Sequence, residues 1–195
     1  MEANVGRHRF PYTLSMCGRY RLARKKEILA EVFDVGDDDD WSPRYNIAPS
    51  QRVPVVRQDA TRPVRSFSLI RWGLIPFWAK DAKAGYKMIN ARAETIAEKP
   101  AFREPLLSRR CLIPADGFYE WSKYSKEKSP FCFTLADDSV FAFAGIWDRW
   151  KNPEGNSSKR VRSLRLRRIH CFPIFMTECR SFSGVKTMIG GLIRD

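Results

Sequence analysis

The sequence predicts an α+β fold, with a mostly antiparallel, partly closed β-sheet or barrel at its core and short helices on its flanks. Three observations support this prediction. At 195 residues and 44% hydrophobic content, the chain has the size and apolar content of a single globular core. Apolar and β-branched residues occur in short strand-like runs separated by turn residues. Helical periodicity is confined to a few short segments.

The strand-like runs follow one another along most of the chain. The run 66–72 alternates in the way that is typical of a half-buried strand, and 111–114 is a short apolar run typical of a buried one. Polar turn signals follow at 115–117 and 137–139. We therefore expect strands at 53–57, 66–72, 111–114, 118–121, 130–136 and 140–147.

Helices are expected in three places. The segment 22–35 predicts a short amphipathic helix that ends at Gly36, because five of its apolar residues follow helical spacing. Shorter helices are expected at 90–98 and 101–107. The acidic run 37–40 is expected to be a solvated loop, and the segment 44–51 to be irregular because of its proline.

Three regions differ in character. We expect residues 1–15 to be a disordered extension or the product of an incorrectly chosen upstream start, because they are polar and without periodicity. Residues 16–150 form the expected single domain. In residues 151–195 arginines interrupt every apolar pattern, so no strand or helix is expected there, and the core is expected to lack its C-terminal strand.

The net charge of +13 favours a polyanionic partner, but its distribution limits that inference. Residues 156–195 contain nine Lys/Arg and two Asp/Glu, a net charge of +7. The other 155 residues carry 26 Lys/Arg and 20 Asp/Glu, a net charge of +6. The body of the protein is therefore only mildly basic, which permits nucleic-acid binding without requiring it.

Composition argues against several classes of protein. Five widely spaced cysteines with no C-x-x-C pair indicate neither a disulfide framework nor a zinc site, and with two histidines we expect no metal or other cofactor. There is no apolar run of the roughly 20 residues that a membrane span needs, and 1–15 lacks the apolar centre of a signal peptide. We expect an intracellular protein, in the cytoplasm or nucleoid of a bacterium or the nucleus of a eukaryote.

A thiol directly follows a methionine at Met16-Cys17. If synthesis began at Met16 and that methionine were removed, Cys17 would carry both a thiol and a free α-amine. A 1,2-aminothiol condenses with an aldehyde, first to a Schiff base and then to a thiazolidine, which an internal cysteine cannot do. The alternative is that Cys17 is a buried, inert cysteine.

Two further features have both a chemical and a structural interpretation. Glu120 lies within a run of three aromatic residues, where desolvation would raise its pKa toward that of a general acid or base. The alternative is that Glu120 lies at the edge of a strand and points outward. The aromatic residues of 73–78, Phe77 and Trp78, are interpreted either as core residues or as a surface on which bases stack.

Six segments together resemble one family, the SOS response-associated peptidases, abasic-site processing proteins that crosslink to damaged single-stranded DNA. Each segment alone is weakly specific, but their combination in this order is highly specific, and it covers about 16–150. The segments are M-C-G-R-Y (16–20), Y-N-I-A-P (45–49), R-W-G-L-I-P (71–76), N-A-R-A-E-T (90–95), C-L-I-P-A-D-G-F-Y-E-W (111–121) and A-G-I-W (144–147).

The resemblance implies roles for individual residues and an SRAP-like fold. Cys17 matches the cysteine that bonds to the abasic site, Asn90 an asparagine that helps to hold the crosslink, and Glu120 the active-site glutamate. Arg19 and Arg92 match positions near the DNA backbone, and Trp72 and Trp78 would supply a base-stacking wedge.

The activity implied by the resemblance is that of a cysteine-dependent, hydrolase- or lyase-like enzyme of DNA damage and the SOS response. It would form a thiazolidine crosslink with abasic sites in single-stranded DNA, and its autopeptidase activity would free the cysteine. We expect a monomer with DNA as its partner. Two alternatives stay open: a non-catalytic nucleic-acid-binding protein that uses its basic tail, and an inactive relic of the family.

The C-terminal region departs from the family pattern. Family members follow their last strand with C-T-I-I-T-T-x-A-N and then I-H-D-R-M-P-V-I, whose histidine joins the active site. His170 lies in a segment that is only superficially similar. The codons of 174–182, read two nucleotides later, can encode I-H-D-R-M-P-V-I, and those of 160–169 can encode C-T-I-I-T-T-E-A-N. We therefore hypothesise a reading-frame shift between Asn152 and Arg160, which would make the basic tail uninformative about DNA binding.

Overall fold

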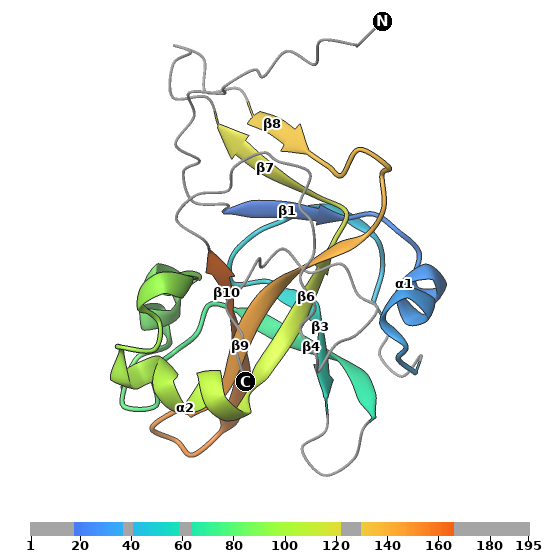
Figure 1. Cartoon of the computed structure of the whole chain (residues 1–195). Coiled ribbons are helices and arrows are strands. Elements are labelled where there is room, and N and C mark those ends of the chain that lie inside the picture. Colours follow the sequence, from blue (N-terminus) through green and yellow to red (C-terminus); the bar gives the residue numbers. More distant parts are fainter. Residues whose placement is uncertain (1–17, 37–40, 59–63, 122–129, 166–195) are drawn as a thin grey trace, which may run out of the picture.

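The computed structural model describes residues 18–36, 41–58, 64–121 and 130–165. Ten strands and a few short helices make up this part of the chain (Figure 1). The elements are β1 (Arg19–Leu22), α1 (Lys26–Phe33), β2 (Arg44–Ile47), β3 (Arg52–Gln58), β4 (Arg65–Trp72), the 3-10 helix η1 (Ala82–Lys87), β5 (Asn90–Arg92), the 3-10 helix η2 (Ala93–Thr95), α2 (Pro100–Ser108), β6 (Arg110–Ala115), β7 (Gly117–Trp121), β8 (Pro130–Phe133), β9 (Phe141–Lys151) and β10 (Ser157–Arg165).

The strands form two sheets. The smaller sheet has the order β2-β1-β7-β8, and all its pairings are antiparallel. The larger has the order β4-β3-β6-β9-β10-β5, and an additional parallel pairing of β10 with β4 closes it into a ring. The expected fold class, a mostly antiparallel and partly closed sheet with short flanking helices, is confirmed.

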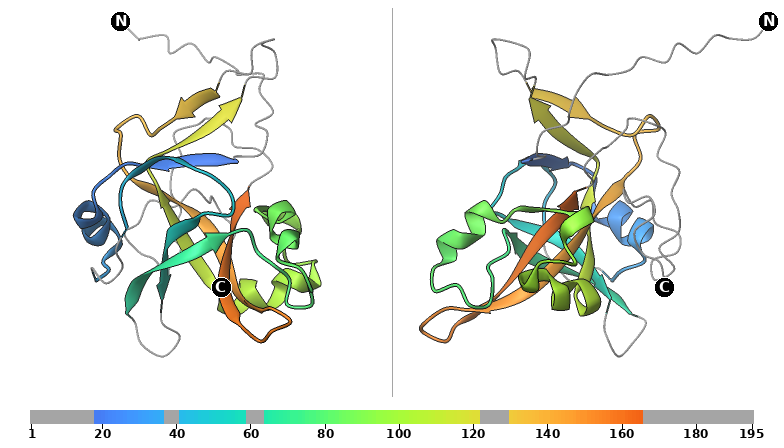
Figure 2. Two further views of the ribbon diagram at one scale, coloured as in Figure 1. Left: turned by 180° about the vertical axis from the view of Figure 1, so that it is seen from behind. Right: turned by 60° about the vertical axis from the view of Figure 1, so that its left-hand side comes forward.

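The helices flank the closed sheet on opposite sides. Figure 2 shows α2 and the 3-10 helices beside β9 and β10, with α1 on the other side of the molecule. The small sheet lies across one end of the closed sheet, and the two are connected where β6 runs into β7 through the single residue Asp116 (Figure 1). The smaller sheet therefore covers one end of the barrel.

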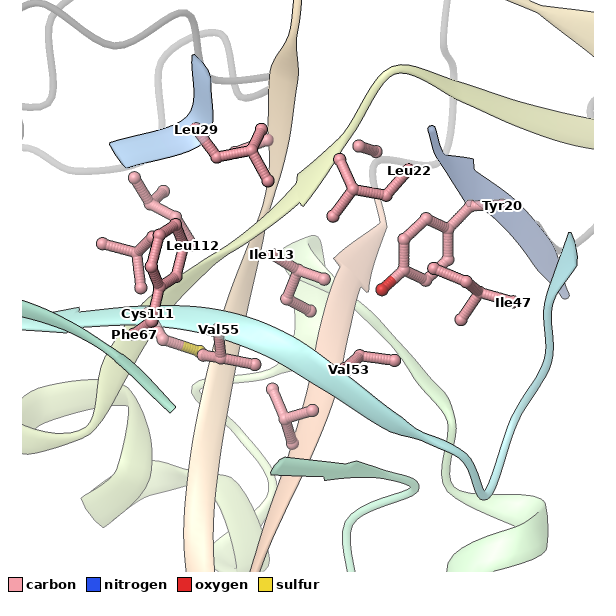
Figure 3. Packing of buried hydrophobic residues seen from close by; sticks show 14 of the residues in the cluster. Tyr20, Leu22, Leu29, Ile47, Val53, Val55, Phe67, Cys111, Leu112 and Ile113 are labelled. Carbon is pink, nitrogen blue, oxygen red and sulfur yellow. The ribbon is translucent and has the colours of Figure 1, made fainter. Parts of the chain in front are cut away.

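The main hydrophobic core fills the space between the two sheets. Tyr20, Leu22 and Ile47 of the small sheet lie over Val53 and Ile113 of the closed sheet (Figure 3). All five side chains are buried. A second cluster lies between α2, the segment before it and the outer face of β9, and consists of Leu74, Ala91, Ile96, Phe102 and Ile146.

A strand is present where the sequence predicted none. β10 pairs antiparallel with β9 from Ser157–Lys151 to Ser163–Gly145, and in parallel with β4 and β5. Val161 in its centre is fully buried. The predictions that no strand follows 151 and that the C-terminal strand is missing are therefore wrong, because backbone pairing to three neighbours defines a strand that the arginine-interrupted pattern does not show.

Two predicted helices also differ from the structure. Leu22 belongs to β1, and α1 starts only at Lys26, because the backbone N–H groups of Ala23 and Arg24 are bonded to a carboxylate rather than to a helical turn. The segment predicted as a helix from 90 begins instead as β5, which pairs in parallel with β10. Tertiary pairing overrides the local helical preference in both places. The predicted helix at 101–107 is confirmed as α2.

Candidate active site

Glu120 is buried in β7, the strand that pairs with β1. Cys17 precedes β1 in the sequence. Glu120 is 6% exposed and lies on the same face of β7 as the core residue Phe118. The interpretation of Glu120 as an outward-pointing edge residue is therefore wrong. A carboxyl group so far out of water can act as an acid or base in a way that a solvated one does not.

The register between β1 and β7 places the start of β1 at this glutamate. Arg19 pairs with Tyr119 and Tyr20 with Phe118, so continuing the register by one residue puts Gly18 opposite Glu120. The next residue toward the N-terminus is Cys17, which lies outside the described residues. One residue of chain spans at most about 3.6 Å, so the position of β1 limits where Cys17 can lie.

Polar contacts from the outer face of the small sheet fix β1 and β7 to β2. Arg19 donates from Nη1 to Asn46 Oδ1 at 2.8 Å. The Tyr119 hydroxyl donates to the backbone carbonyl of Tyr45 at 2.7 Å, and burial together with the nearby Cys132 raises the pKa of this phenol. From the sequence, Arg19 was expected only as a DNA contact, and its bond to Asn46 was not predicted, although Asn46 is the second residue of the Y-N-I-A-P motif.

Trp72 is a core residue that connects β1 to the segment of Asn90. It is 4% exposed, and its ring meets that of Tyr20 edge-on with centroids 5.4 Å apart. Its indole Nε1–H donates to the carbonyl of Ile89 at 2.9 Å, and Asn90 is the next residue. A buried ring has no face on which a base could stack, so we correct the interpretation of Trp72 as a wedge and assign it to the core.

Asn90 and Arg92 are the first and last residues of β5, at the edge of the closed sheet. Asn90 is half-buried and pairs with Ser163 of β10, whereas Arg92 is exposed. The structure thus places Glu120 and Arg19 on one sheet, Glu120 on its core-facing side and Arg19 on its outer side, and places Asn90 on the other sheet. The contacts of Trp72 with both β1 and Ile89 join the two groups.

Trp78 lies on the surface and keeps a face available for stacking. It is 54% exposed, and Phe77, which is also exposed, meets it edge-on with centroids 4.8 Å apart. Hydrophobic rings side by side in water form a patch suited to a binding partner, so Phe77 joins Trp78 as a candidate contact residue.

Two glycines hold this aromatic segment against the barrel. Gly73 follows β4 with φ of 125°, and a Cβ there would lie 2.7 Å from the carbonyl oxygen of Gly85. The two backbones can approach this closely only because neither residue has a side chain. The two ends of the segment that carries Phe77 and Trp78 are therefore held against each other, directly after β4.

Among the residues that the structure describes, no group of three or more His, Cys, Asp or Glu side chains is arranged to hold a metal ion. In the same residues, no helix is long and apolar enough to cross a membrane. The chemistry that the described site offers is therefore that of a buried carboxylate, an amide, arginines and exposed aromatic rings. His170 lies outside the described residues.

Comparisons with known proteins agree with the six motifs. The family described as SOS response associated peptidase (SRAP) matches residues 16–174. The abasic site processing protein YoqW of Bacillus subtilis is 48% identical over 145 residues, which cover 72% of this chain and 64% of that protein. YoaM of the same organism is 48% identical over 144 residues, with coverages of 72% and 63%. The chain thus spans slightly less than two thirds of the length of these relatives.

More distant similarities extend to vertebrates and to solved structures. The abasic site processing protein HMCES of Xenopus tropicalis is 32% identical over 150 residues, 63% of this chain and 45% of that protein. A crystal structure of a Bordetella bronchiseptica protein matches with a TM-score of 0.67 at 29% identity, covering 77% of this chain and 72% of that one. A Bacteroides thetaiotaomicron protein matches in fold with a TM-score of 0.69 at 23% identity, covering 89% and 88%. With a family match over most of its length, the chain belongs to the SOS response associated peptidase (SRAP) family.

Proposed function

We propose that this protein is an abasic-site processing protein that crosslinks covalently to abasic sites in single-stranded DNA through Cys17. The observation that carries the proposal is the burial of Glu120 in β7, one residue beyond the pair of Tyr119 with Arg19, the first residue of β1. Cys17 precedes Arg19 by two residues in the sequence. The names of the relatives, which process abasic sites, support the same substrate.

The proposed reaction needs no cofactor. The abasic sugar opens to an aldehyde, and the free amine of Cys17 attacks its carbonyl carbon and forms a Schiff base with loss of one water. The thiolate then adds to the imine carbon, which forms the C–S bond, and the nitrogen takes up a proton. The product is a thiazolidine, and the whole condensation releases one water molecule.

Glu120 is the proposed proton carrier. In its protonated form it donates to the hydroxyl group that leaves as water when the Schiff base forms, and as a carboxylate it accepts the proton of the thiol. We propose the same group for autopeptidase activity, in which water hydrolyses the peptide bond between Met16 and Cys17. Asn90 would hold the sugar or the amide of the crosslink.

The exposed residues of the site supply the proposed DNA contacts. Arg19 and Arg92 would pair with backbone phosphates, which position a strand without reading its sequence. Trp78 offers an exposed ring for stacking, and a base–aromatic stack is worth about 1–3 kcal/mol. Trp72 has no part in this contact, since it is buried.

We also propose that the reading frame of the coding DNA shifts between Asn152 and Arg160, so that the chain after this point is translated out of the family's frame. The coding DNA tests this directly. If the nucleotides of codons 160–169 and 174–182 spell the two family motifs in the frame two nucleotides later, the proposal stands. Any other sequence at these codons refutes it.

The function is tested by mixing protein that has a free Cys17 with single-stranded DNA containing one abasic site, followed by denaturing electrophoresis. We expect an adduct that Cys17→Ser abolishes. DNA binding without any adduct would instead favour a non-catalytic binding protein. The absence of both would favour an inactive relic, and a chain restored to the alternate frame would then recover the activity.

A further inference from the structure

Asp116 is a fully buried carboxylate whose oxygens are all used to hold the end of β1. Its Oδ1 accepts from Arg21 Nε at 2.9 Å, and its Oδ2 accepts from the backbone N–H groups of Ala23 at 2.7 Å and Arg24 at 3.1 Å. Its own backbone N–H donates to the carbonyl of Arg21 at 3.1 Å. The single residue between β6 and β7 thus binds three residues at and just beyond the end of β1, namely Arg21, Ala23 and Arg24.

The neighbouring glycine leaves room for this contact. A Cβ at Gly117 would lie 3.0–3.2 Å from three atoms of the Arg21 side chain, which crosses the glycine on its way to Asp116. The φ of Gly117 is not positive, so space rather than backbone conformation requires glycine here. Asp116 therefore binds the Arg21 side chain, and Gly117 leaves the space through which that side chain reaches Asp116.

A second carboxylate holds the same arginines from the surface. Asp138, in the loop between β8 and β9, lies 3.7 Å from Arg21 Nη2 and accepts from Arg24 Nη2 at 2.7 Å. Burial is the largest single influence on Arg21 and lowers its pKa, but the charge of Asp116, the hydrogen bond to it and the smaller contributions of Cys132 and Asp138 together raise the pKa above its ordinary value. Arg21 is thus charged and bound at all ordinary pH values.

A buried carboxylate is costly even when it is paired, and a turn of this kind needs no buried charge. What the contacts provide is a fixed register for a strand of only four residues. Slippage of β1 by one position would move its start by about 3.3 Å and exchange its two faces. Gly18 would then no longer lie opposite Glu120.

We propose that Asp116 is a positioning residue for the crosslinking reaction: by holding Arg21 and the backbone at the end of β1, it fixes the register of β1 against β7 and so keeps Gly18, the residue after Cys17, opposite Glu120. This inference rests on the proposed function. Asp116 acts through β1 and does not itself touch the DNA.

The test uses the full chain with the recognition sequence of a site-specific protease placed directly before Cys17. Cleavage after folding frees the amine, and mass spectrometry confirms the new N-terminus. Crosslinking rates are measured at increasing concentrations of an oligonucleotide with one abasic site, which gives a maximal rate and a half-saturating concentration. The rate with acetaldehyde measures the intrinsic reactivity of Cys17.

Asp116→Asn keeps the size of the side chain but turns an NH₂ group toward N–H donors. We expect its maximal crosslinking rate to fall about 10- to 100-fold, the loss that follows a misplacement of about 1 Å. Its half-saturating DNA concentration and its rate with acetaldehyde should change less than about twofold. Ile146→Val, in the second core cluster, is the control for lost stability and should keep the rate of the unsubstituted chain.

Arg21→Lys provides a second variant that keeps the positive charge but removes the guanidinium group, and with it the Nε contact with Asp116 and the Nη2 contact with Asp138. We expect a smaller loss of the maximal rate, and this variant decides the question if Asp116→Asn does not fold. If the maximal rate of Asp116→Asn or of Arg21→Lys equals that of the control Ile146→Val, the positioning role is wrong. The proposed function would be unaffected by that result. If the unsubstituted chain forms no adduct, the proposed function fails and this inference falls with it.

Discussion

Replacement of Trp72 by phenylalanine separates a core role from a role in DNA binding. The indole Nε1–H donates to the carbonyl of Ile89, and the ring packs edge-on against Tyr20 within the main core. Phenylalanine keeps an aromatic ring but removes the donor and leaves part of the volume of the indole empty. We therefore expect Trp72→Phe to lower the free energy of unfolding and to leave DNA binding nearly unchanged.

The magnitude follows from two contributions. A hydrogen bond of this kind contributes about 1 kcal/mol, and the smaller ring loses roughly another 1 kcal/mol of burial, with a further cost for any cavity. The sum is about 2–3 kcal/mol. For a protein of this size, each kcal/mol shifts the melting temperature by about 2–4 °C, so we expect a decrease of about 4–12 °C.

The assay is thermal unfolding together with binding of single-stranded DNA by fluorescence anisotropy. Trp78→Phe is the matched control, since the same change is made at a ring that is 54% exposed, and its stability should change by no more than about 0.5 kcal/mol. A Trp72→Phe variant that unfolds at the temperature of the unsubstituted chain but binds DNA more weakly would refute the assignment of Trp72 to the core.

Three further outcomes follow from the structure. Trp78→Ala should raise the half-saturating DNA concentration about fivefold or more, since one stacked base is worth about 1–3 kcal/mol, and an unchanged value in a titration would remove Trp78 from the DNA site. In chemical denaturation, Gly73→Ala should destabilise the fold by more than Gly155→Ala, because both residues have positive φ but only the first would meet backbone atoms; equal losses would contradict the close approach. In the folded protein at pH 8, a thiol reagent should modify the exposed Cys132, whereas burial raises the pKa of the Cys111 thiol and keeps it protonated and unreactive; peptide mapping would show the reverse if Cys111 were accessible.

The fold class could be predicted from the sequence because it depends on short-range patterns. The alternation in 66–72 and the apolar run 111–114 correspond to β4 and β6. β10 could not be found in this way, since its arginines hide the alternation and only its pairing with β4, β5 and β9 defines it. Parallel pairing between β10 and β5 likewise turned the predicted helix start at Asn90 into a strand.

The candidate site could likewise be predicted only in part from the sequence. The aromatic neighbours of Glu120 indicated a desolvated carboxylate, and its burial agrees with that prediction. The sequence could not distinguish Trp72 from Trp78, because the two lie six residues apart in one apolar segment and only the closed barrel puts the first inside. Nor could it show that Asp116, which has the pattern of a turn, binds Arg21 across 95 positions of the chain.

The central claim is that Cys17 bonds to the abasic site through both its amine and its thiol. Mass spectrometry of the protease-digested adduct tests it most directly. We predict that the DNA is attached to the peptide that begins at Cys17, with a total mass equal to peptide plus abasic DNA minus one water, and that borohydride adds no hydrogen because the imine has already closed to a thiazolidine. Attachment at any other residue, or an adduct that borohydride reduces, would contradict the claim.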